Sequence, residues 1–279
     1  MSENDATPVN QKPARVYDWP TLVAITLVVY AMSTVIHEGL GHGGACLLMG
    51  DQPRVVSTVH FECSRDTRFM MAGGTIANLI AGLIFVLLLH RMRSAPASVR
   101  YFLWLSMTIN LLRAAGYLIY SGIGNIGDWS EFIAGFGNQW AWRSGMTVLG
   151  AIAYWMFIRK SLTELLPFIG SNGGTVDDKR VERAHRLTID PYLAGGVFEC
   201  IAGLFNPIGM LLVAVSAAAA AFGGGSGLGW MSHLLHGNRF PIGPAAPPME
   251  IRRSWTWIAC AAAVAVVYVG FLGPGLRLS

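Results

Sequence analysis

The chain has 279 residues, of which 53% are hydrophobic and only 13% are charged, and its formal net charge is +4. Charged residues make up about a quarter of an ordinary soluble protein, so this composition excludes a soluble globular domain. The small positive charge is better explained by orientation in a membrane than by affinity for nucleic acid. We expect an all-α, multi-pass membrane protein.

Six apolar runs could cross a bilayer as helices, since about 20 residues are needed for one crossing. They cover residues 20–36, 69–89, 101–123, 145–158, 194–221 and 254–273. On this basis the chain divides into four parts. They are a disordered tail (1–19), a transmembrane core (20–158), a polar cytoplasmic connection (159–193) and C-terminal transmembrane helices with a loop rich in glycine and proline (194–279).

With six crossings, twelve Lys and Arg residues fall on the side of the N-terminus and seven on the other side. The positive-inside rule then predicts a cytoplasmic N-terminus. In this arrangement Arg252 and Arg253 lie opposite the N-terminus, whereas the C-terminal Arg277 lies on the same side as it.

Three ionisable side chains, His37, Glu38 and His42, lie near the end of the first apolar run. Zinc peptidases commonly carry two histidines four residues apart beside a catalytic Glu. Here the histidines are five apart, which on a regular α-helix separates them by roughly 140°, whereas Glu38 and His42 differ by only about 40°. A π-type turn, or unwinding at the intervening glycines, would bring both imidazoles together.

A possible third metal ligand, Asp128, follows a glycine-broken segment at the end of the third apolar run. If the spans alternate in direction, Asp128 emerges on the same membrane face as His37 and His42. Two histidines and one carboxylate would leave one coordination position of a zinc ion open for water. Alternatively, Asp128 only caps the short helix that follows it.

Two more ionisable groups lie inside apolar runs, Arg113 in the third and Glu199 in the fifth. Such groups face protein or water rather than lipid. They could form a buried ion pair, or Glu199 could line the site. Asn78, in a segment of small residues in the second run, could form a hydrogen bond to a neighbouring helix.

The remaining histidines and the cysteines give weaker signals. His233 and His236 are three residues apart and could present two ligands on one helical turn. His60 and Glu62 have no metal-ligand spacing. The four cysteines show no paired spacing and predict neither a disulfide framework nor a cysteine zinc site; they are Cys46, Cys63, Cys200 and Cys260.

Residues 37–43, the segment 73–79 and the segment 125–128 together resemble the site-2 protease family of intramembrane zinc metalloproteases. The resemblance covers about residues 30–130 and implies that His37, His42 and Asp128 hold Zn²⁺ and that Glu38 is the general base. The chain departs from the family pattern in two places. Three residues rather than two separate Glu38 from His42, and Trp129 rather than glycine follows Asp128.

The function expected on this basis is hydrolysis of a peptide bond in or near a membrane-embedded segment of a protein or peptide. We assign Asn78 to substrate binding, together with Asn206, whose Asn-Pro sequence faintly resembles a substrate-clamping segment of that family. The oligomeric state is left open.

Two other classes of function fit the same residues. One is an iron oxidase or hydroxylase that uses Glu38, His42 and Glu199 with His233 and His236. The other is a transporter or scaffold whose intramembrane charges are structural. Metal content separates the three classes, because they predict zinc, iron and no metal respectively.

Overall fold

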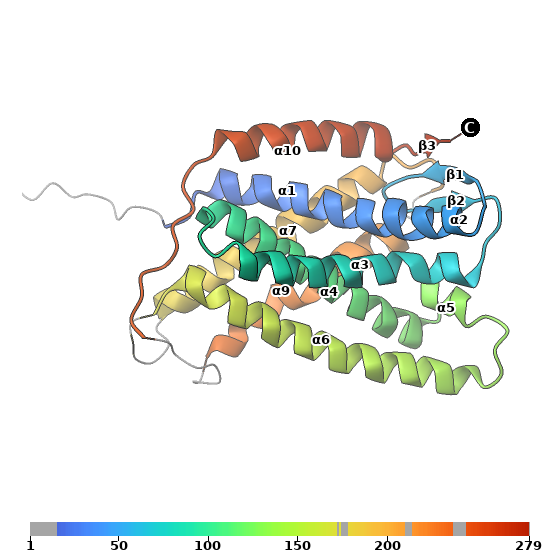
Figure 1. Ribbon diagram of the computed structural model, residues 1–279, viewed down its shortest axis with the longest axis horizontal. Coiled ribbons are helices and arrows are strands. Elements are labelled where there is room, and N and C mark those ends of the chain that lie inside the picture. The colour runs from blue at the N-terminus through green and yellow to red at the C-terminus, as the bar shows by residue number, and fades with distance from the viewer. Residues whose placement is uncertain (1–15, 172, 174–177, 210–213, 237–243, 279) are drawn as a thin grey trace, which may run out of the picture.

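The computed structural model describes residues 16–171, 173, 178–209, 214–236 and 244–278. These residues form a helical bundle, as the composition predicts, together with one small sheet that it did not predict (Figure 1). The predicted tail falls mostly on residues 1–15, which lie outside the described residues. Tyr17, which was assigned to that tail, is buried, and its hydroxyl donates to the carbonyl of Phe168 at 2.7 Å. Residues 17–19 therefore belong to the fold.

Six long helices form the bundle: α1 (Trp19–Val35), α3 (Arg68–Arg91), α4 (Ala97–Gly124), α6 (Gln139–Ile169), α7 (Asp178–Gly203) and α10 (Trp255–Val267). Shorter helical segments connect or extend them: η1 (Ile36–Gly43), α2 (Gly44–Leu48), α5 (Asp128–Phe132), η2 (Ala214–Gly223), η3 (Gly224–Ser226), α9 (Gly227–Trp230), η4 (Met231–Leu235) and η5 (Tyr268–Leu272). The strands are β1 (Pro53–Val56), β2 (Phe61–Cys63) and β3 (Leu276–Arg277), in the antiparallel order β2-β1-β3.

Four helical stretches of the described chain are long and apolar enough to cross a membrane: Trp19–Leu48, Arg68–Arg91, Ala97–Gly124 and Trp255–Leu272. These stretches support the assignment of the chain as a membrane protein. Helices α6 and α7 are also long, at 31 and 26 residues, but both carry charged side chains. Region 159–193, predicted as a polar connection, is largely the end of α6 and the start of α7. Leu162, Leu165 and Ala184 from this region are fully buried.

Helix α4 is the centre of the bundle, and α10 lies at its periphery. In the most apolar window of each helix, 78% of α4 is buried but only 11% of α10. The core around α4 includes Trp104, Leu105, Ile109 and Leu112, all fully buried. An apolar helix that is exposed to this extent is compatible with a lipid environment, where water is absent from the hydrocarbon region.

The bundle has two ends, which we call the amino end and the site end. At the amino end Arg253, just before α10, donates from Nε to Asp18 Oδ1 at 2.8 Å. At the site end, on the right of Figure 1, lie the sheet, α2 and α5. Because Arg277 of β3 pairs with Val55 of β1, helix α10 runs from the amino end to the site end.

This direction of α10 corrects the predicted topology. The run 194–221 was expected to be one span, but it contains the end of α7 and a returning segment, η2. The hydroxyl of Tyr192 in α7 donates to the carbonyl of Phe222 in η2 at 3.2 Å, so the two segments lie side by side. Arg252 and Arg253 therefore lie at the amino end and Arg277 at the site end, opposite to the prediction for each.

The structure also corrects the reading of the cysteines. Cys46 of α2 and Cys63 of β2 form a disulfide. Their spacing in the sequence gave no sign of it, because the intervening residues turn back through the β1–β2 hairpin and return Cys63 to α2. The disulfide fixes this hairpin beside the end of the first helix. Cys200 and Cys260 are free.

Candidate metal centre

The histidine motif lies on a π-helix, η1, which follows directly from α1. A π turn places residue i+5 above residue i, whereas an α turn does so for i+4. His37 and His42 therefore project from the same side of η1, and their Nε2 atoms are 3.3 Å apart. This is one of the two local distortions that the five-residue spacing predicted.

Glycine allows η1 to pack closely against α3. A Cβ atom at Gly41 would lie 2.5 Å from the Cα of Gly74 and 2.7 Å from the carbonyl oxygen of Gly73. No ordinary carbon contact is that short, so both helices need glycine where they meet. The close approach brings the imidazoles onto the face of α3.

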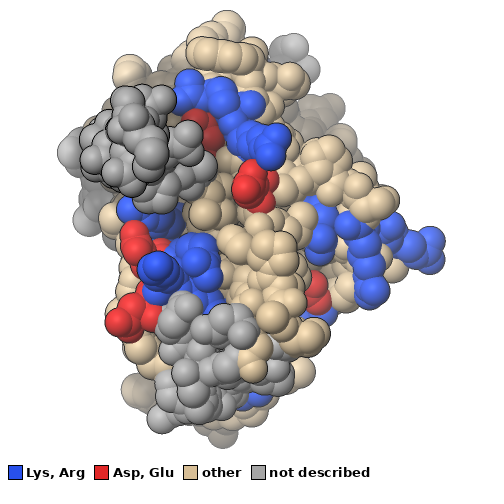
Figure 2. All heavy atoms as spheres, turned by 90° about the vertical axis from the view of Figure 1, so that its left-hand side faces the viewer, with Lys and Arg blue, Asp and Glu red and all other residues tan. Residues whose placement is uncertain are grey.

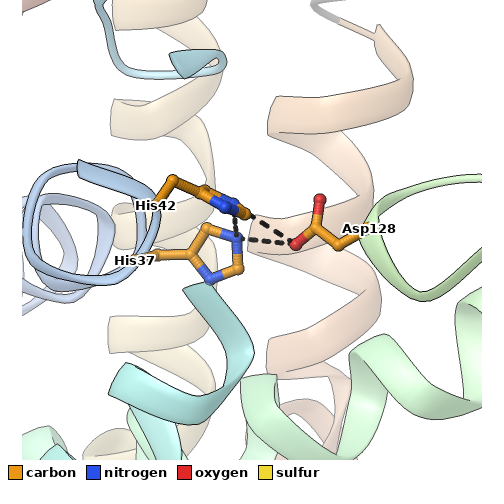
Figure 3. Close-up of side chains that lie close together, drawn as sticks. All are labelled: His37, His42 and Asp128. Atoms are coloured by element: carbon orange, nitrogen blue, oxygen red, sulfur yellow. Dashed lines mark hydrogen bonds and ion pairs between the residues drawn. The ribbon is translucent and has the colours of Figure 1, made fainter. Parts of the chain in front are cut away.

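Three ligand atoms converge from two separate parts of the chain (Figure 3). Asp128 Oδ2 lies 3.1 Å from His37 Nε2 and 3.4 Å from His42 Nε2. Atoms bound tetrahedrally to one zinc ion at about 2.05 Å are about 3.3 Å apart, so the three spacings fit one zinc ion. The group is the one set of three or more His, Cys, Asp or Glu in the described chain that could hold a metal.

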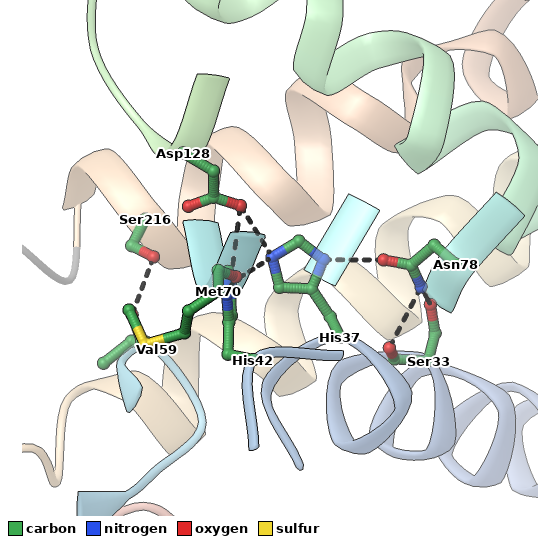
Figure 4. Close-up of polar contacts among 8 residues, drawn as sticks. All are labelled: Ser33, His37, His42, Val59, Met70, Asn78, Asp128 and Ser216. Atoms are coloured by element: carbon green, nitrogen blue, oxygen red, sulfur yellow. Dashed lines mark hydrogen bonds and ion pairs between the residues drawn. The ribbon is translucent and has the colours of Figure 1, made fainter. Parts of the chain in front are cut away.

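The far nitrogen of each imidazole forms a hydrogen bond that suits a metal ligand (Figure 4). His37 Nδ1 is 2.7 Å from Asn78 Oδ1, and His42 Nδ1 is 2.7 Å from the carbonyl oxygen of Met70. Both acceptors are oxygens, so each Nδ1 is the donor and each Nε2 keeps its lone pair. Metal-binding histidines usually have a partner of this kind on the other nitrogen.

Asp128 is the first residue of α5, at the same end of the bundle as the histidines, as alternating spans predicted. The preceding Gly127 has φ of 81°, a conformation that favours glycine. The side chain is 19% exposed.

Gly74 of α3 forms the floor of the centre, a role that the sequence did not reveal. A Cβ atom at this position would lie 2.6 Å from His37 Nε2 and 2.7 Å from His42 Nε2. Only glycine leaves the ligand nitrogens accessible. Glycine in a membrane helix usually reflects helix packing, so nothing in the segment of small residues distinguished this position.

A cavity of about 1020 Å³ opens onto the centre and is lined by Glu38, His42 and Asp128. Its walls come from the β1–β2 hairpin, α3, α4, α5 and η2. The hydroxyl of Ser216 in η2 donates to the carbonyl of Val59 at 2.9 Å, which joins two of these walls (Figure 4). The cavity has room for a peptide segment beside the ligand atoms.

Glu38 and Tyr117 are two of the polar side chains that line this cavity. The side chain of Glu38 is buried, but its carboxylate forms no hydrogen bond or ion pair with any other residue that the structure describes. Its carboxylate is therefore free to bind water in the cavity. Tyr117 lines the same cavity, and its ring centre lies 4.7 Å from that of His37. Tyr117 was not predicted as a site residue, because a tyrosine in an apolar helix belongs to no recognisable motif.

Arg113 and Glu199 form a buried ion pair, and both line a small cavity together with His37 and Glu38. Arg113 Nη2 donates to Glu199 Oε2 at 2.5 Å, and the two side chains are 3% and 4% exposed. Thr34 Oγ1 donates to Glu199 Oε1 at 2.7 Å. The pair joins α4, α7 and α1, so the ion pair predicted for Glu199 is observed, and Glu199 also borders a small cavity next to the centre.

The two asparagines assigned to substrate binding occupy other settings. Asn78 is fully buried, and its side-chain oxygen bonds to His37. Asn206 Nδ2 donates to the carbonyl of Gly273 at 3.2 Å. Neither is among the described residues that line the large cavity. Their assignment to substrate contact remains a prediction without geometric support.

The histidines considered for an iron site do not join the centre. His233 of η4 packs against His185 of α7, with ring centres 4.9 Å apart, and His236 lies beside them. This group lies toward the amino end. His60 forms a local pair with Glu62 at 3.1 Å. The oxidase ligand set of Glu38, His42, Glu199, His233 and His236 is therefore not assembled in this structure.

Comparison with known proteins adds no relative to this picture. No protein-family model, no curated protein and no solved structure matches the chain. The similarity to site-2 proteases therefore rests on the short motifs described above.

Proposed function

We propose that this protein is a membrane-embedded zinc hydrolase that cleaves a peptide bond in or beside a transmembrane segment of another protein. The proposal is carried by one observation, the tetrahedral spacing of His37, His42 and Asp128 next to a cavity that Glu38 also lines. Zinc hydrolases need three protein ligands, an open coordination position and a nearby carboxylate.

Each residue has a distinct part in this proposal. A zinc ion held by His37, His42 and Asp128 would supply Lewis acidity and lower the pKa of a bound water. Glu38 accepts the proton of the attacking water and returns it to the leaving nitrogen. No other described residue bonds to the Glu38 carboxylate, which leaves it free for this transfer.

We further propose that the N-terminus is cytoplasmic and that the centre faces the opposite side. Of the Lys and Arg residues that the structure describes, eleven lie toward the amino end: Arg91, Arg93, Arg100, Arg159, Lys160, Lys179, Arg180, Arg183, Arg186, Arg252 and Arg253. Five lie toward the site end: Arg54, Arg65, Arg68, Arg143 and Arg277. Figure 2 views the amino end and shows basic side chains spread over it. This asymmetry favours a cytoplasmic amino end.

The disulfide supports the same orientation independently. Disulfides persist in oxidising compartments and are rare in the cytosol. The Cys46–Cys63 bond lies at the site end, beside the cavity, where Cys63 is a lining residue. The substrate segment would then meet the centre from the non-cytoplasmic side.

Metal analysis of the purified protein tests the first part of the proposal. We expect one zinc ion per chain in the wild type and in Glu38→Gln, and no retained zinc in His37→Ala or His42→Ala. Iron in place of zinc would support the oxidase. A folded wild type without metal would support a transporter or scaffold.

Comparison of cleavage products tests the second part. Detergent-solubilised membrane proteins are incubated with wild type or with Glu38→Gln, and new N-termini are identified by chemical labelling and mass spectrometry. We expect new termini in or next to apolar segments with the wild type alone. Equal sets of termini with both proteins would refute hydrolysis by Glu38.

A further inference from the structure

Four fully buried polar residues form a chain of hydrogen bonds behind His37: Ser33, Asn78, Ser106 and Asn110. They come from three helices, α1, α3 and α4, and part of the chain is drawn in Figure 4. None of them contributes an atom to the candidate metal centre. Buried polar groups usually form hydrogen bonds with one another, and the side-chain amides of Asn78 and Asn110 each have determined partners here.

The series of hydrogen bonds begins at Asn110, whose side-chain orientation is set within α4. Its Nδ2 donates to the carbonyl oxygen of Ser106 at 2.8 Å. Reversing the amide would set two oxygens against each other, so Oδ1 must face the other way. There it accepts hydrogen bonds from Asn78 Nδ2 at 2.7 Å and from Ser33 Oγ at 3.2 Å.

Asn110 and the backbone carbonyl of Ser33 together determine the orientation of Asn78. Besides its bond to Asn110, Asn78 Nδ2 donates to the carbonyl oxygen of Ser33 at 3.2 Å. With its nitrogen facing two acceptors, Asn78 must present Oδ1 to His37, where it lies 2.7 Å from Nδ1. An oxygen can only accept, so His37 carries its proton on Nδ1 and keeps the lone pair on Nε2.

The two imidazoles differ in the kind of group that accepts the hydrogen bond from Nδ1. The partner of His42 Nδ1 is the backbone carbonyl of Met70, whose polarity no side chain can reverse. The partner of His37 is a side-chain amide, which could present either its oxygen or its nitrogen. An amide nitrogen next to Nδ1 would favour the tautomer that has a proton on Nε2, where a metal must bind.

We propose that Asn110, which has no contact with His37, is a positioning residue that fixes the tautomer of this ligand through Asn78. The inference deepens the proposed function, because it concerns the same metal site. It predicts that the affinity for Zn²⁺ depends on a side chain in α4 that lies two hydrogen bonds away from the nearest ligand.

The experiment compares Asn110→Leu with the double variant Asn110→Leu/Asn78→Asp. The Zn²⁺ affinity of each protein in detergent is measured by competition with a chromophoric chelator. Leucine removes the closer of the two acceptors that orient Asn78, which lies at 2.7 Å against 3.2 Å for the carbonyl oxygen of Ser33. We therefore expect Asn110→Leu to bind Zn²⁺ about 10–100-fold more weakly than wild type, as for other second partners of ligands. A carboxylate at position 78 offers an oxygen in either orientation, so the double variant should recover most of that loss.

Ser106→Ala is the matched control. Its hydroxyl is buried without a partner, whereas the bond from Asn110 uses the backbone oxygen of Ser106, which alanine keeps. We expect its Zn²⁺ affinity to equal that of wild type. A general packing defect would weaken both variants of α4 and would not be rescued by Asp at position 78.

The possible failures are distinguishable. Unchanged affinity in Asn110→Leu, or a double variant as weak as the single one, would overturn the role of Asn110 while leaving the metal site intact. A folded wild type that takes up no Zn²⁺ would overturn the site itself and the inference with it.

Discussion

At the residue scale, the centre depends on the open space beside the ligand atoms as much as on the ligands themselves. Each imidazole is held from behind by an oxygen, and the space in front of both is kept open by Gly74. A metal ion needs that space, because its ligands must approach within about 2.1 Å. The glycine is therefore part of the site although it has no side chain.

Gly74→Ala tests this requirement. The added methyl group would lie within 2.7 Å of both ligand nitrogens, so we expect the variant to lose Zn²⁺ retention although the ligands are unchanged. Zinc content after purification measures the effect. Gly44→Ala is the control, because a Cβ there meets nothing within 4 Å. Normal zinc content in Gly74→Ala would show that the nitrogens do not share an ion at this place.

At the element scale, three helices are joined by the buried pair of Arg113 and Glu199. Removing one member of such a pair leaves an uncompensated charge, which costs about 3–5 kcal/mol, whereas replacing both members with apolar residues costs much less. We therefore expect Arg113→Leu and Glu199→Leu each to lower thermal stability strongly in detergent. The double variant should be more stable than either single variant. Additive losses would contradict this account of the pair.

The junction between α1 and α10 depends on Asp18, which caps α1 through the backbone nitrogen of Thr21 at 3.1 Å and pairs with Arg253. Burial opposes its ionisation, but the hydrogen bonds from Arg253 and Thr21 outweigh burial and lower the pKa of the Asp18 carboxyl. We expect Asp18→Ala to cost about 1 kcal/mol, mostly from the lost cap. Asp18→Asn keeps the cap and should cost less.

The pH dependence of this junction has a definite sign. A carboxyl whose pKa is lower in the folded state stabilises the protein above its unfolded pKa of about 3.9, and this contribution is lost as the pH falls through the folded value. The stability advantage of wild type over Asp18→Asn should therefore be constant from pH 7 to 5 and shrink on further acidification. Thermal unfolding at several pH values measures it, and an advantage that grew with acid would contradict the assignment.

Some features of the site could be predicted from the sequence, and others depend on how the helices pack. The five-residue spacing of His37 and His42 predicted a local distortion, because an α-helix cannot bring those rings together, and η1 is a π-helix. Alternation of spans placed Asp128 at the same end. The position of Asn78 behind His37 and the openness at Gly74 depend on the packing of α3 against η1, which motif spacing does not encode.

The same limit explains the error in topology. Both the end of α7 and the returning η2 are apolar, so composition merged them into one run at 194–221. The reversal between them changes the side of every later residue. The disulfide was missed because Cys63 reaches Cys46 only through the turn of the β1–β2 hairpin.

At the scale of the whole molecule, the fold places its two ends in different surroundings. The start of α1 and the C-terminal strand β3 lie at opposite ends, since β3 pairs with β1 beside the centre. Basic residues gather at the amino end and the disulfide lies at the site end. The proposed orientation therefore predicts that Ser94, between α3 and α4, faces the cytoplasm and that Leu278 does not.

Labelling of single introduced cysteines in intact cells tests that orientation. Ser94→Cys should be protected from a membrane-impermeant maleimide until the cells are opened, whereas Leu278→Cys should react at once. The parent protein is the control for Cys200 and Cys260, which are free. The reverse pattern would place the centre in the cytoplasm, and labelling of both from outside would contradict the course of α10.

The central claim is that His37, His42 and Asp128 hold a single zinc ion. X-ray absorption at the zinc edge of the loaded wild type tests it most directly. We expect a four-coordinate shell of nitrogen and oxygen at about 2.0–2.1 Å that contains two imidazoles. A sulfur shell at about 2.3 Å, or a zinc shell that contains no imidazole, would contradict it.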